Sequence, residues 1–460
     1  MMKKVSAALM VFILVMQFAS LAVFGEENKA DSSGAPALKA EAAVLMDQKT
    51  GKVLYEKESH KRMYPASLTK ILTAVLVIEN LDLEEPVTVG KEINRIGKDS
   101  SGAGLSVGEK LTVRDLVWAL MLPSGNDASY TAAVTVARKK SGNASMDIQE
   151  AIKYFIDMMD KRAQEIGAKE SNFTNPDGYP DDKHYSTAFD MALISKEAMK
   201  NDFFKEVVKT YSYKAKDDAA SQTSSKGKKG PAEWTNKNLL INPDSKYYYE
   251  YATGIKTGST SAAGYCLASS ATRNDISLIS IVMKDDKEEA RWADTKTLFE
   301  YGFENFKYYE ILRKGMPVGN IGVVRKYLGD TVKIDALAGQ DYVDIMSGQD
   351  FKSLKQEIEW DAGLALPAKD GEAEATLSGP IKSGQTIGKV VYSLNGSVLA
   401  ESSLIAGKDS NKGDFTDIVY TALEQGFTHL YIVIPAFVLF VAAIIVLLWK
   451  RGASRRRMEN

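Results

Sequence analysis

The apolar positions of residues 40–305 follow a strand pattern at both ends and a helix pattern in between. Short apolar runs bounded by turn residues predict strands at 42–46, 53–55, 254–256, 265–271 and 276–283. Apolar residues at helical spacing predict helices at 67–79, 112–120, 127–139, 147–166 and 288–303. Strands from both ends are most economically joined in one antiparallel sheet that helices cover. The pattern therefore predicts an α+β fold, an antiparallel sheet flanked by helices, with a helical subdomain.

Loops and a second domain follow from changes in this pattern. Pro and Gly in residues 171–188 predict a long loop, and the Lys-, Ser- and Gly-rich stretch 214–238 predicts a solvated loop, with binding to an anionic wall polymer as the alternative. From residue 306 to 406, short alternating runs are separated by Gly-rich turns, which is typical of a small all-β domain. The polar residues after it, 407–429, are assigned to a linker.

The N-terminus has the pattern of a secretory signal. Two lysines precede an apolar stretch that reaches Phe24, and the small residues Ala22 and Gly25 lie near its end. We assign residues 1–25 to a signal peptide and 26–39 to a flexible leader. An uncleaved membrane anchor is the alternative, and cleavage after Ala22 or after Gly25 stays open.

The C-terminus has the pattern of a membrane anchor. Residues 430–449 contain no charge, and at about 1.5 Å per residue they span a hydrocarbon core of roughly 30 Å. The basic tail 450–460 follows at once, and basic flanks stay on the cytoplasmic side. The sequence therefore predicts a single-pass C-terminal transmembrane helix, with the bulk of the chain on the extracytoplasmic face of the membrane.

Composition narrows the chemistry. The 460 residues suffice for two or more domains. The 58 basic and 60 acidic residues nearly balance, which argues against a dedicated nucleic-acid binder. The single cysteine, Cys266, excludes intrachain disulfides, and three histidines leave few combinations for a metal site.

The segment Ser67-Leu68-Thr69-Lys70 is a candidate nucleophile and base. Spacing of three on a helix places the Ser67 hydroxyl and the Lys70 amine on one face. Serine is a weak nucleophile and needs a base. A lysine serves as that base only when it is neutral, so its pKa must fall through burial or nearby positive charge.

Two further short segments complement this pair. Ser124-Gly125-Asn126 lies in a break between two predicted helices, where a hydroxyl can relay a proton and an amide can hold a substrate carbonyl. Lys256-Thr257-Gly258 lies at a strand end, where the lysine and threonine can hold a carboxylate and Gly258 permits close approach of a substrate. The combination S-x-x-K, S-x-N and K-T-G is the motif set of β-lactamases and penicillin-binding proteins.

With these motifs the chain resembles the low-molecular-mass penicillin-binding proteins that are serine-type D-alanyl-D-alanine carboxypeptidases. The resemblance covers essentially the whole mature chain and includes the segments 63–70, 121–128, 173–190 and 255–265. It implies a β-lactamase/transpeptidase-like fold. It also implies that the terminal D-alanine is trimmed from peptidoglycan stem pentapeptides, that penicillins acylate the enzyme, and that no metal or cofactor is needed.

The resemblance also implies residue roles. Ser67 would be acylated and Lys70 would be its base; Ser124 and Asn126 would serve proton transfer and positioning. Lys256 and Thr257, beside Gly258, would bind the terminal carboxylate. The backbone N–H groups of Ser67 and Ser259 would form the oxyanion hole.

Two departures leave the deacylation rate and side-chain preference open. Ser259 stands where some family members carry histidine after K-T-G, and Asp177 occupies a position that another residue often holds.

Several alternatives remain. A class A β-lactamase needs a glutamate in an E-x-x-L-N loop, and no such pattern lies between Gly125 and Lys256. A zinc peptidase needs clustered ligands, but His60 and His184 are far apart in sequence. A Ser-His-Asp hydrolase would have to recruit His184, for which a loop-anchoring role is favoured. A non-catalytic penicillin-sensing receptor on the same fold is distinguished by turnover.

Overall fold

The computed structural model describes residues 35–97, 100–215, 233–325, 331–366 and 376–410, with isolated positions between 419 and 446. These residues form two compact units that divide between Glu304 and Asn305. The expected signal peptide and nearly all of the expected transmembrane helix lie outside the described residues. Among the residues that are described, no helix has the length and apolar character needed to cross a membrane.

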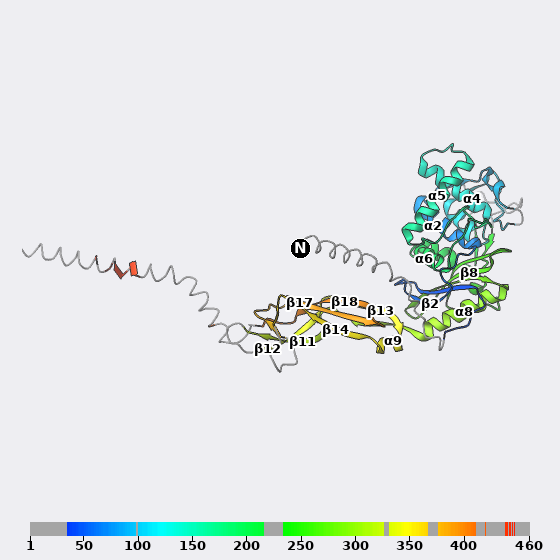
Figure 1. Ribbon diagram of the computed structural model, residues 1–460. Coiled ribbons are helices and arrows are strands. Elements are labelled where there is room, and N and C mark those ends of the chain that lie inside the picture. Colours follow the sequence, from blue (N-terminus) through cyan, green and yellow to red (C-terminus); the bar gives the residue numbers. More distant parts are fainter. Residues whose placement is uncertain are drawn as a thin grey trace, which may run out of the picture. The chain divides into compact units, whose positions relative to one another are not determined.

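A five-stranded antiparallel sheet lies at the centre of the first unit (Figure 1), in the spatial order β2-β1-β9-β8-β7. Its strands are β1 Ala42–Asp47, β2 Val53–Lys57, β7 Ala252–Thr260, β8 Gly264–Arg273 and β9 Ile276–Asp285. Val44 of β1 pairs with Ile281 of β9, so the two ends of this unit share one sheet. The prediction of one antiparallel sheet built from both ends is therefore confirmed.

Helices cover both faces of this sheet, which explains why β1 is buried at every position. Val44 joins the core formed with the helical subdomain. Its neighbour Leu45 points to the opposite face, because side chains alternate along a strand. There a Cβ at Gly302 would lie 2.8 Å from Leu45 Cδ2, which brings α8 (Glu288–Asn305) against the sheet. Figure 1 shows the sheet between α8 and α6 (Ala188–Ala198).

The helical subdomain connects β2 to β7 and carries most of the large core. Its main elements are η1 Ala66–Thr69, α2 Lys70–Asn80, α3 Val113–Met121, α4 Asn126–Ser141, α5 Ile148–Ile166 and α7 Asp202–Lys209. Short elements complete it: β3 Pro86–Thr88, β4 Lys110–Thr112, β5 Ser212–Lys214, β6 Glu233–Thr235, η2 Lys91–Arg95 and η3 Leu239–Ile241. The predicted cap of α3 is present, since Thr112 Oγ1 accepts from Asp115 N at 3.1 Å. The predicted helix at 67–79 begins instead with a 3₁₀ turn.

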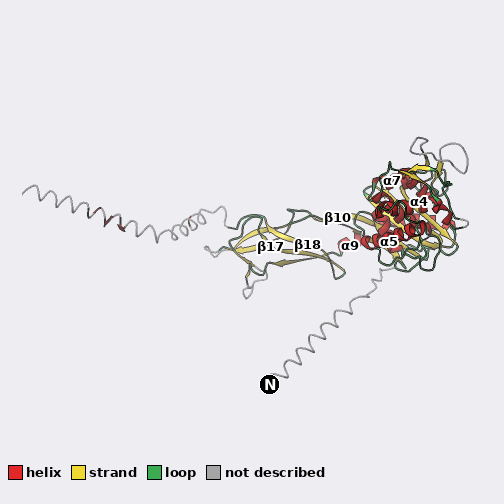
Figure 2. Cartoon of the chain, turned by 90° about the horizontal axis from the view of Figure 1, so that it is seen from above, coloured by secondary structure: helices red, strands yellow, loops and turns green. Residues whose placement is uncertain are grey.

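The second unit is built mainly from strands (Figure 2), as the alternating pattern predicts. Its larger sheet has the order β14-β17-β18-β12-β11-β16-β15, and β10 pairs with β13 in a smaller one. These elements are β10 Phe306–Leu312, β11 Pro317–Val324, β12 Thr331–Ala338, β13 Tyr342–Ser347, α9 Gly348–Lys352, β14 Lys355–Trp360, β15 Ala365–Leu366, β16 Thr376–Ser378, β17 Thr386–Leu394 and β18 Ser397–Ala406. Aliphatic side chains such as Ile334, Val390 and Leu404 form its own buried core.

Candidate active site

Ser67 lies on the tight turn η1, which two glycines from distant segments hold in place. Ala66, directly before it, has a φ of +48°, a conformation that residues other than glycine rarely adopt. A Cβ at Gly258 of β7 would lie 3.0 Å from Pro65 O, and a Cβ at Gly178 would overlap Ala66 O. Only glycine permits the approach at Gly178, and a side chain at position 258 would press on the turn. The backbone of the nucleophile turn is therefore strained and fixed from two sides, a feature that clusters at functional sites.

Lys70 begins α2 and is fully buried. Its Nζ donates to Ser67 Oγ at 2.9 Å, to Asn126 Oδ1 at 2.7 Å and to the backbone oxygen of Asp177 at 2.8 Å. Burial lowers the pKa of Lys70 to about 8; the Asp177 carboxylate opposes this shift and the Lys237 ammonium adds to it. An amine with this pKa is partly neutral near neutral pH, so it can accept the Ser67 proton.

Ser124 and Asn126 lie where α3 gives way to α4. Ser124 has a φ of +64°, is 4% exposed, and its Oγ has no hydrogen-bond partner among the described residues. Asn126 is the first residue of α4 and is nearly buried. Its Oδ1 accepts a hydrogen bond from Lys70, and this contact fixes the orientation of the amide group, including its NH₂. This break thus holds a serine with a strained backbone and, two residues later, an amide that contacts the lysine.

Asp127 fixes the loop opposite this break. Its carboxylate accepts from the backbone N–H groups of Ala103, Gly104 and Leu105 at 2.8, 2.9 and 3.0 Å. Charge-assisted bonds of this kind are about twice as strong as neutral ones. Asp127 therefore ties the segment that carries Ser101 to the start of α4.

Lys256 and Thr257 lie on β7, the edge strand next to the nucleophile turn. Lys256 is 2% exposed and its Nζ donates to Thr257 O at 3.0 Å. Burial, with the charges of Lys70, Lys237 and Arg291, holds the pKa of Lys256 well below its ordinary value. A bound anion would reduce the repulsion among these positive charges. The site is therefore favourable for the carboxylate end of a peptide.

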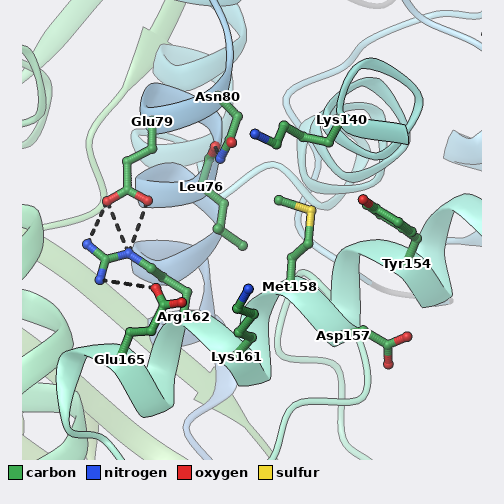
Figure 3. Close-up of a pocket in the computed structure, with 10 residues that line it drawn as sticks. All are labelled: Leu76, Glu79, Asn80, Lys140, Tyr154, Asp157, Met158, Lys161, Arg162 and Glu165. Carbon is green, nitrogen blue, oxygen red and sulfur yellow. Dashed lines mark hydrogen bonds and ion pairs between the residues drawn. The ribbon is translucent and has the colours of Figure 1, made fainter. Parts of the chain in front are cut away.

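A cleft of about 290 Å³ opens onto the nucleophile. Its lining residues are Ser67, Ser100, Ser101, Asn126, Asp177, Gly178, Tyr179, Pro180, Ser259, Thr260 and Ser261. The structure thus brings Ser67, Asn126 and Ser259 to one cleft, with Lys70 buried directly behind. A wider hollow of about 600 Å³ lies elsewhere, between α2, α4 and α5 (Figure 3). There Arg162 pairs with Glu79, and none of the candidate catalytic side chains lines it.

Two cations of the site, Lys237 and Arg291, were absent from the sequence-based candidates. Lys237 donates to Ser101 Oγ at 2.7 Å, at the cleft wall. Arg291 is 5% exposed and forms an ion pair with Glu288 at 2.6 Å. A signal existed for Arg291, because it is a charged residue on the buried face of an amphipathic helix. The sequence analysis assigned Lys237 to a solvated loop at 214–238. The described end of that stretch differs, because it contains β6 and the buried residues Trp234 and Asn238.

His184 has contacts that agree with the loop-anchoring role. It is buried, its Nδ1 accepts from Thr174 N at 3.1 Å, and its Nε2 lies 2.9 Å from Thr69 Oγ1. Burial lowers the pKa of His184 to about 4, so the ring is neutral and ties the loop to η1. The described residues contain no group of three His, Cys, Asp or Glu side chains placed to hold a metal ion.

Comparisons with known proteins agree with this geometry. The D-alanyl-D-alanine carboxypeptidase family matches residues 29–287, and the C-terminal domain of penicillin-binding protein 5 matches residues 306–412. D-alanyl-D-alanine carboxypeptidase DacF of Bacillus subtilis is 31% identical over 90% of this chain and 96% of its own length. DacA of Haemophilus influenzae is 33% identical over 80% of this chain and 84% of its own.

Solved structures give the same result. Penicillin-binding protein 5 from Haemophilus influenzae has a TM-score of 0.58 at 29% identity and covers 82% of this chain and 98% of that one. The Streptomyces K15 DD-transpeptidase has a TM-score of 0.52 at 35% identity and covers 58% of this chain and 98% of that one. Since the family model matches more than half of the chain and a relative that is 31% identical covers 90% of it, the chain belongs to the D-alanyl-D-alanine carboxypeptidase family of serine peptidases.

Proposed function

We propose that this chain removes the terminal D-alanine from peptidoglycan stem pentapeptides through an acyl-enzyme on Ser67, and that penicillins acylate the same serine. The observation that supports this most directly is the contact of 2.9 Å between Lys70 Nζ and Ser67 Oγ. Lys70 is buried there and the burial lowers its pKa to about 8. A nucleophile paired with a base that is partly neutral at physiological pH is what acyl transfer requires.

In acylation, Lys70 takes the proton of Ser67 Oγ while that oxygen attacks the carbonyl carbon of the penultimate D-alanine. The negative charge that develops on the carbonyl oxygen would be stabilised by the N–H groups of Ser67 and Ser259. The C–N bond then breaks, and the leaving amine of D-alanine receives the proton from Lys70, with the Ser124 hydroxyl as relay. The balance is one ester formed, one amide broken and one D-alanine released.

Substrate orientation follows from charge. Lys256, with Arg291 and Lys237 nearby, would pair with the free carboxylate of the terminal D-alanine. Thr257 is on the same strand and Gly258 packs against the nucleophile turn, so a peptide end that reaches Lys256 also passes Ser67. Asn126 would hold the amide of the preceding residue. This arrangement favours a carboxypeptidase over an enzyme that cleaves inside a chain.

We also propose the extracytoplasmic location. An N-terminal signal at 1–25 and a C-terminal anchor at 430–449 would place the peptidase domain, 40–305, on the side of the membrane where peptidoglycan lies. The β-rich domain, 306–406, would then separate the active site from the membrane, and 407–429 and 450–460 would be linker and cytoplasmic tail.

Labelling with a fluorescent penicillin, combined with release of D-alanine, tests the function. We expect the modified peptide in mass spectrometry to contain Ser67, and we expect D-alanine release from an N-acylated Lys-D-Ala-D-Ala tripeptide. Ser67→Ala should lose both. A stable adduct on Ser67 without D-alanine release would instead indicate a penicillin-sensing receptor.

A further inference from the structure

Asp177 is a buried carboxylate at the catalytic cleft that acylation does not use. The residue is 1% exposed and belongs to the lining of the same cleft as Ser67 and Asn126. Its Oδ1 accepts from Tyr179 N at 3.2 Å, but its Oδ2 has no hydrogen-bond partner among the described residues. Leaving a buried carboxylate oxygen unpartnered is costly, and such exceptions concentrate where a substrate or a reacting water completes the site.

Two independent contacts hold Asp177 beside the nucleophile. The backbone oxygen of Asp177 accepts from Lys70 Nζ at 2.8 Å, and Lys70 itself donates to Ser67 Oγ. The next residue, Gly178, packs against Ala66 O so closely that a Cβ would not fit. The loop and the nucleophile turn are therefore fixed together, and the backbone of Asp177 is held beside the nucleophile.

We propose that Asp177 is the general base that activates the water that hydrolyses the acyl-enzyme. The inference rests on the acyl-enzyme at Ser67 proposed above. Burial raises the pKa of Asp177, while the neighbouring Lys70 charge and the Asn126 side chain oppose that shift. A carboxylate with a raised pKa is a stronger base than an ordinary one. The Lys70 charge lowers the pKa of Asp177 and so favours its ionised, basic form.

The proposed step is balanced. Asp177 Oδ2 takes one proton from a water molecule as the water oxygen attacks the carbonyl carbon of the Ser67 ester. The tetrahedral intermediate collapses and the bond between the carbonyl carbon and Ser67 Oγ breaks. Lys70, which acylation leaves neutral, takes the proton from Asp177 and passes one to Oγ; its Nζ contacts both Ser67 Oγ and the Asp177 main chain. The products are the shortened peptide and free Ser67, and Asp177 and Lys70 return to their starting protonation states.

The proposed base does not belong to any of the recognised sequence motifs. A class A β-lactamase places a glutamate for this purpose in E-x-x-L-N, which the chain lacks. Here the carboxylate comes from the segment Asn175-Pro176-Asp177-Gly178, where Gly178 has a φ of +84° and permits the close approach. The chemistry is the same, but a different stretch of chain supplies it.

Asp177→Asn tests the proposal in the full-length protein, because it keeps the size of the side chain and removes the base. Asp182→Asn is the matched control, since it neutralises an exposed carboxylate in the same loop. Two rates are measured: formation of the fluorescent penicillin adduct, and its loss after excess penicillin is removed. For Asp177→Asn we expect formation within a few-fold of wild type and adduct loss slower by about 10²–10⁴-fold, the usual contribution of a general base. Asp182→Asn should match wild type in both.

Hydroxylamine provides a second measurement. It attacks esters with less help from a base than water needs, so it should release the adduct from Asp177→Asn much faster than buffer does. Equal adduct lifetimes in Asp177→Asn and wild type would overturn the proposal. Equal slowing of formation and loss would also overturn it, because Asp177 would then act through Lys70, which serves both steps. Failure of the wild-type protein to form any adduct would instead overturn the function proposed above.

Discussion

Replacing Lys70 by methionine tests the base on which acylation depends. Lys70→Met keeps a long, unbranched side chain and removes the amine. A positioned general base contributes about 10²–10⁴-fold to a rate, so the rate of penicillin acylation should fall by that factor. The fold should survive, although Asn126 Oδ1 and Asp177 O lose their donor at a cost of about 1–3 kcal/mol each. Removing a buried amine from the folded state offsets part of that cost.

The magnitude of the wild-type effect follows from the pKa. Burial lowers the pKa of Lys70 from 10.5 to about 8. At pH 7 this raises the neutral fraction from about 1 in 3,000 to about 1 in 11, a gain of roughly 300-fold. The base must be neutral, so acylation should become faster as pH rises: about tenfold between pH 6 and 7, then levelling off above about pH 9.

The assay is the second-order rate of fluorescent penicillin acylation between pH 6 and 10, for wild type, Lys70→Met and the surface control Lys61→Met. Circular dichroism and thermal unfolding establish that each variant is folded. A folded Lys70→Met protein that acylates at the wild-type rate would refute the role of Lys70. So would a wild-type rate that does not change between pH 6 and 8.

Three further predictions use other parts of the structure. Lys256→Ala should slow acylation by the tripeptide and by penicillin by about tenfold or more, because each loses a cation that pairs with its carboxylate; acylation as fast as wild type would show that another group binds it. Asp127→Ala should lower the free energy of unfolding by about 2–4 kcal/mol, because three backbone N–H groups lose their carboxylate; an unchanged melting temperature in thermal unfolding would contradict this. A protein that lacks residues 1–25 and ends before Leu430 should stay in the supernatant after ultracentrifugation with membranes and release D-alanine as fast as the full chain; retention in the membrane pellet would indicate a second attachment surface.

The patterns that repeat over many residues were sufficient to predict the fold class. Short apolar runs at 42–46 and 276–283, with helical spacing between, predict strands from both ends and helices in the middle. Thr112 and Asp115 predict a helix start because capping is local chemistry. The helices α6 and α7 were not predicted. In α7 the signal was present, because Phe204, Val207 and Val208 have helical spacing, but the segment has only eight residues.

The candidate nucleophile, base and carboxylate-binding residues could also be predicted from the sequence. S-x-x-K, S-x-N and K-T-G are short segments, and their residue types indicate the chemistry. The roles assigned to them remain predictions, to be settled by the experiments above. The geometry that makes them plausible was not in the sequence: no motif states that Lys70 is fully buried, or that Gly178 and Gly258 press on one turn.

The chain by itself therefore determined which segments become strands and helices and which side chains have the means for acyl transfer, because both depend on residues close together in sequence. Only the tertiary structure decided which charges meet. Lys237 and Arg291 come from segments on either side of β7, and Asp177 from a loop more than a hundred residues after the nucleophile. The desolvation that lowers the pKa of Lys70 and the unpartnered oxygen of Asp177 arise only when these distant segments pack together, because burial and Coulomb interactions depend on distance in space and not along the chain.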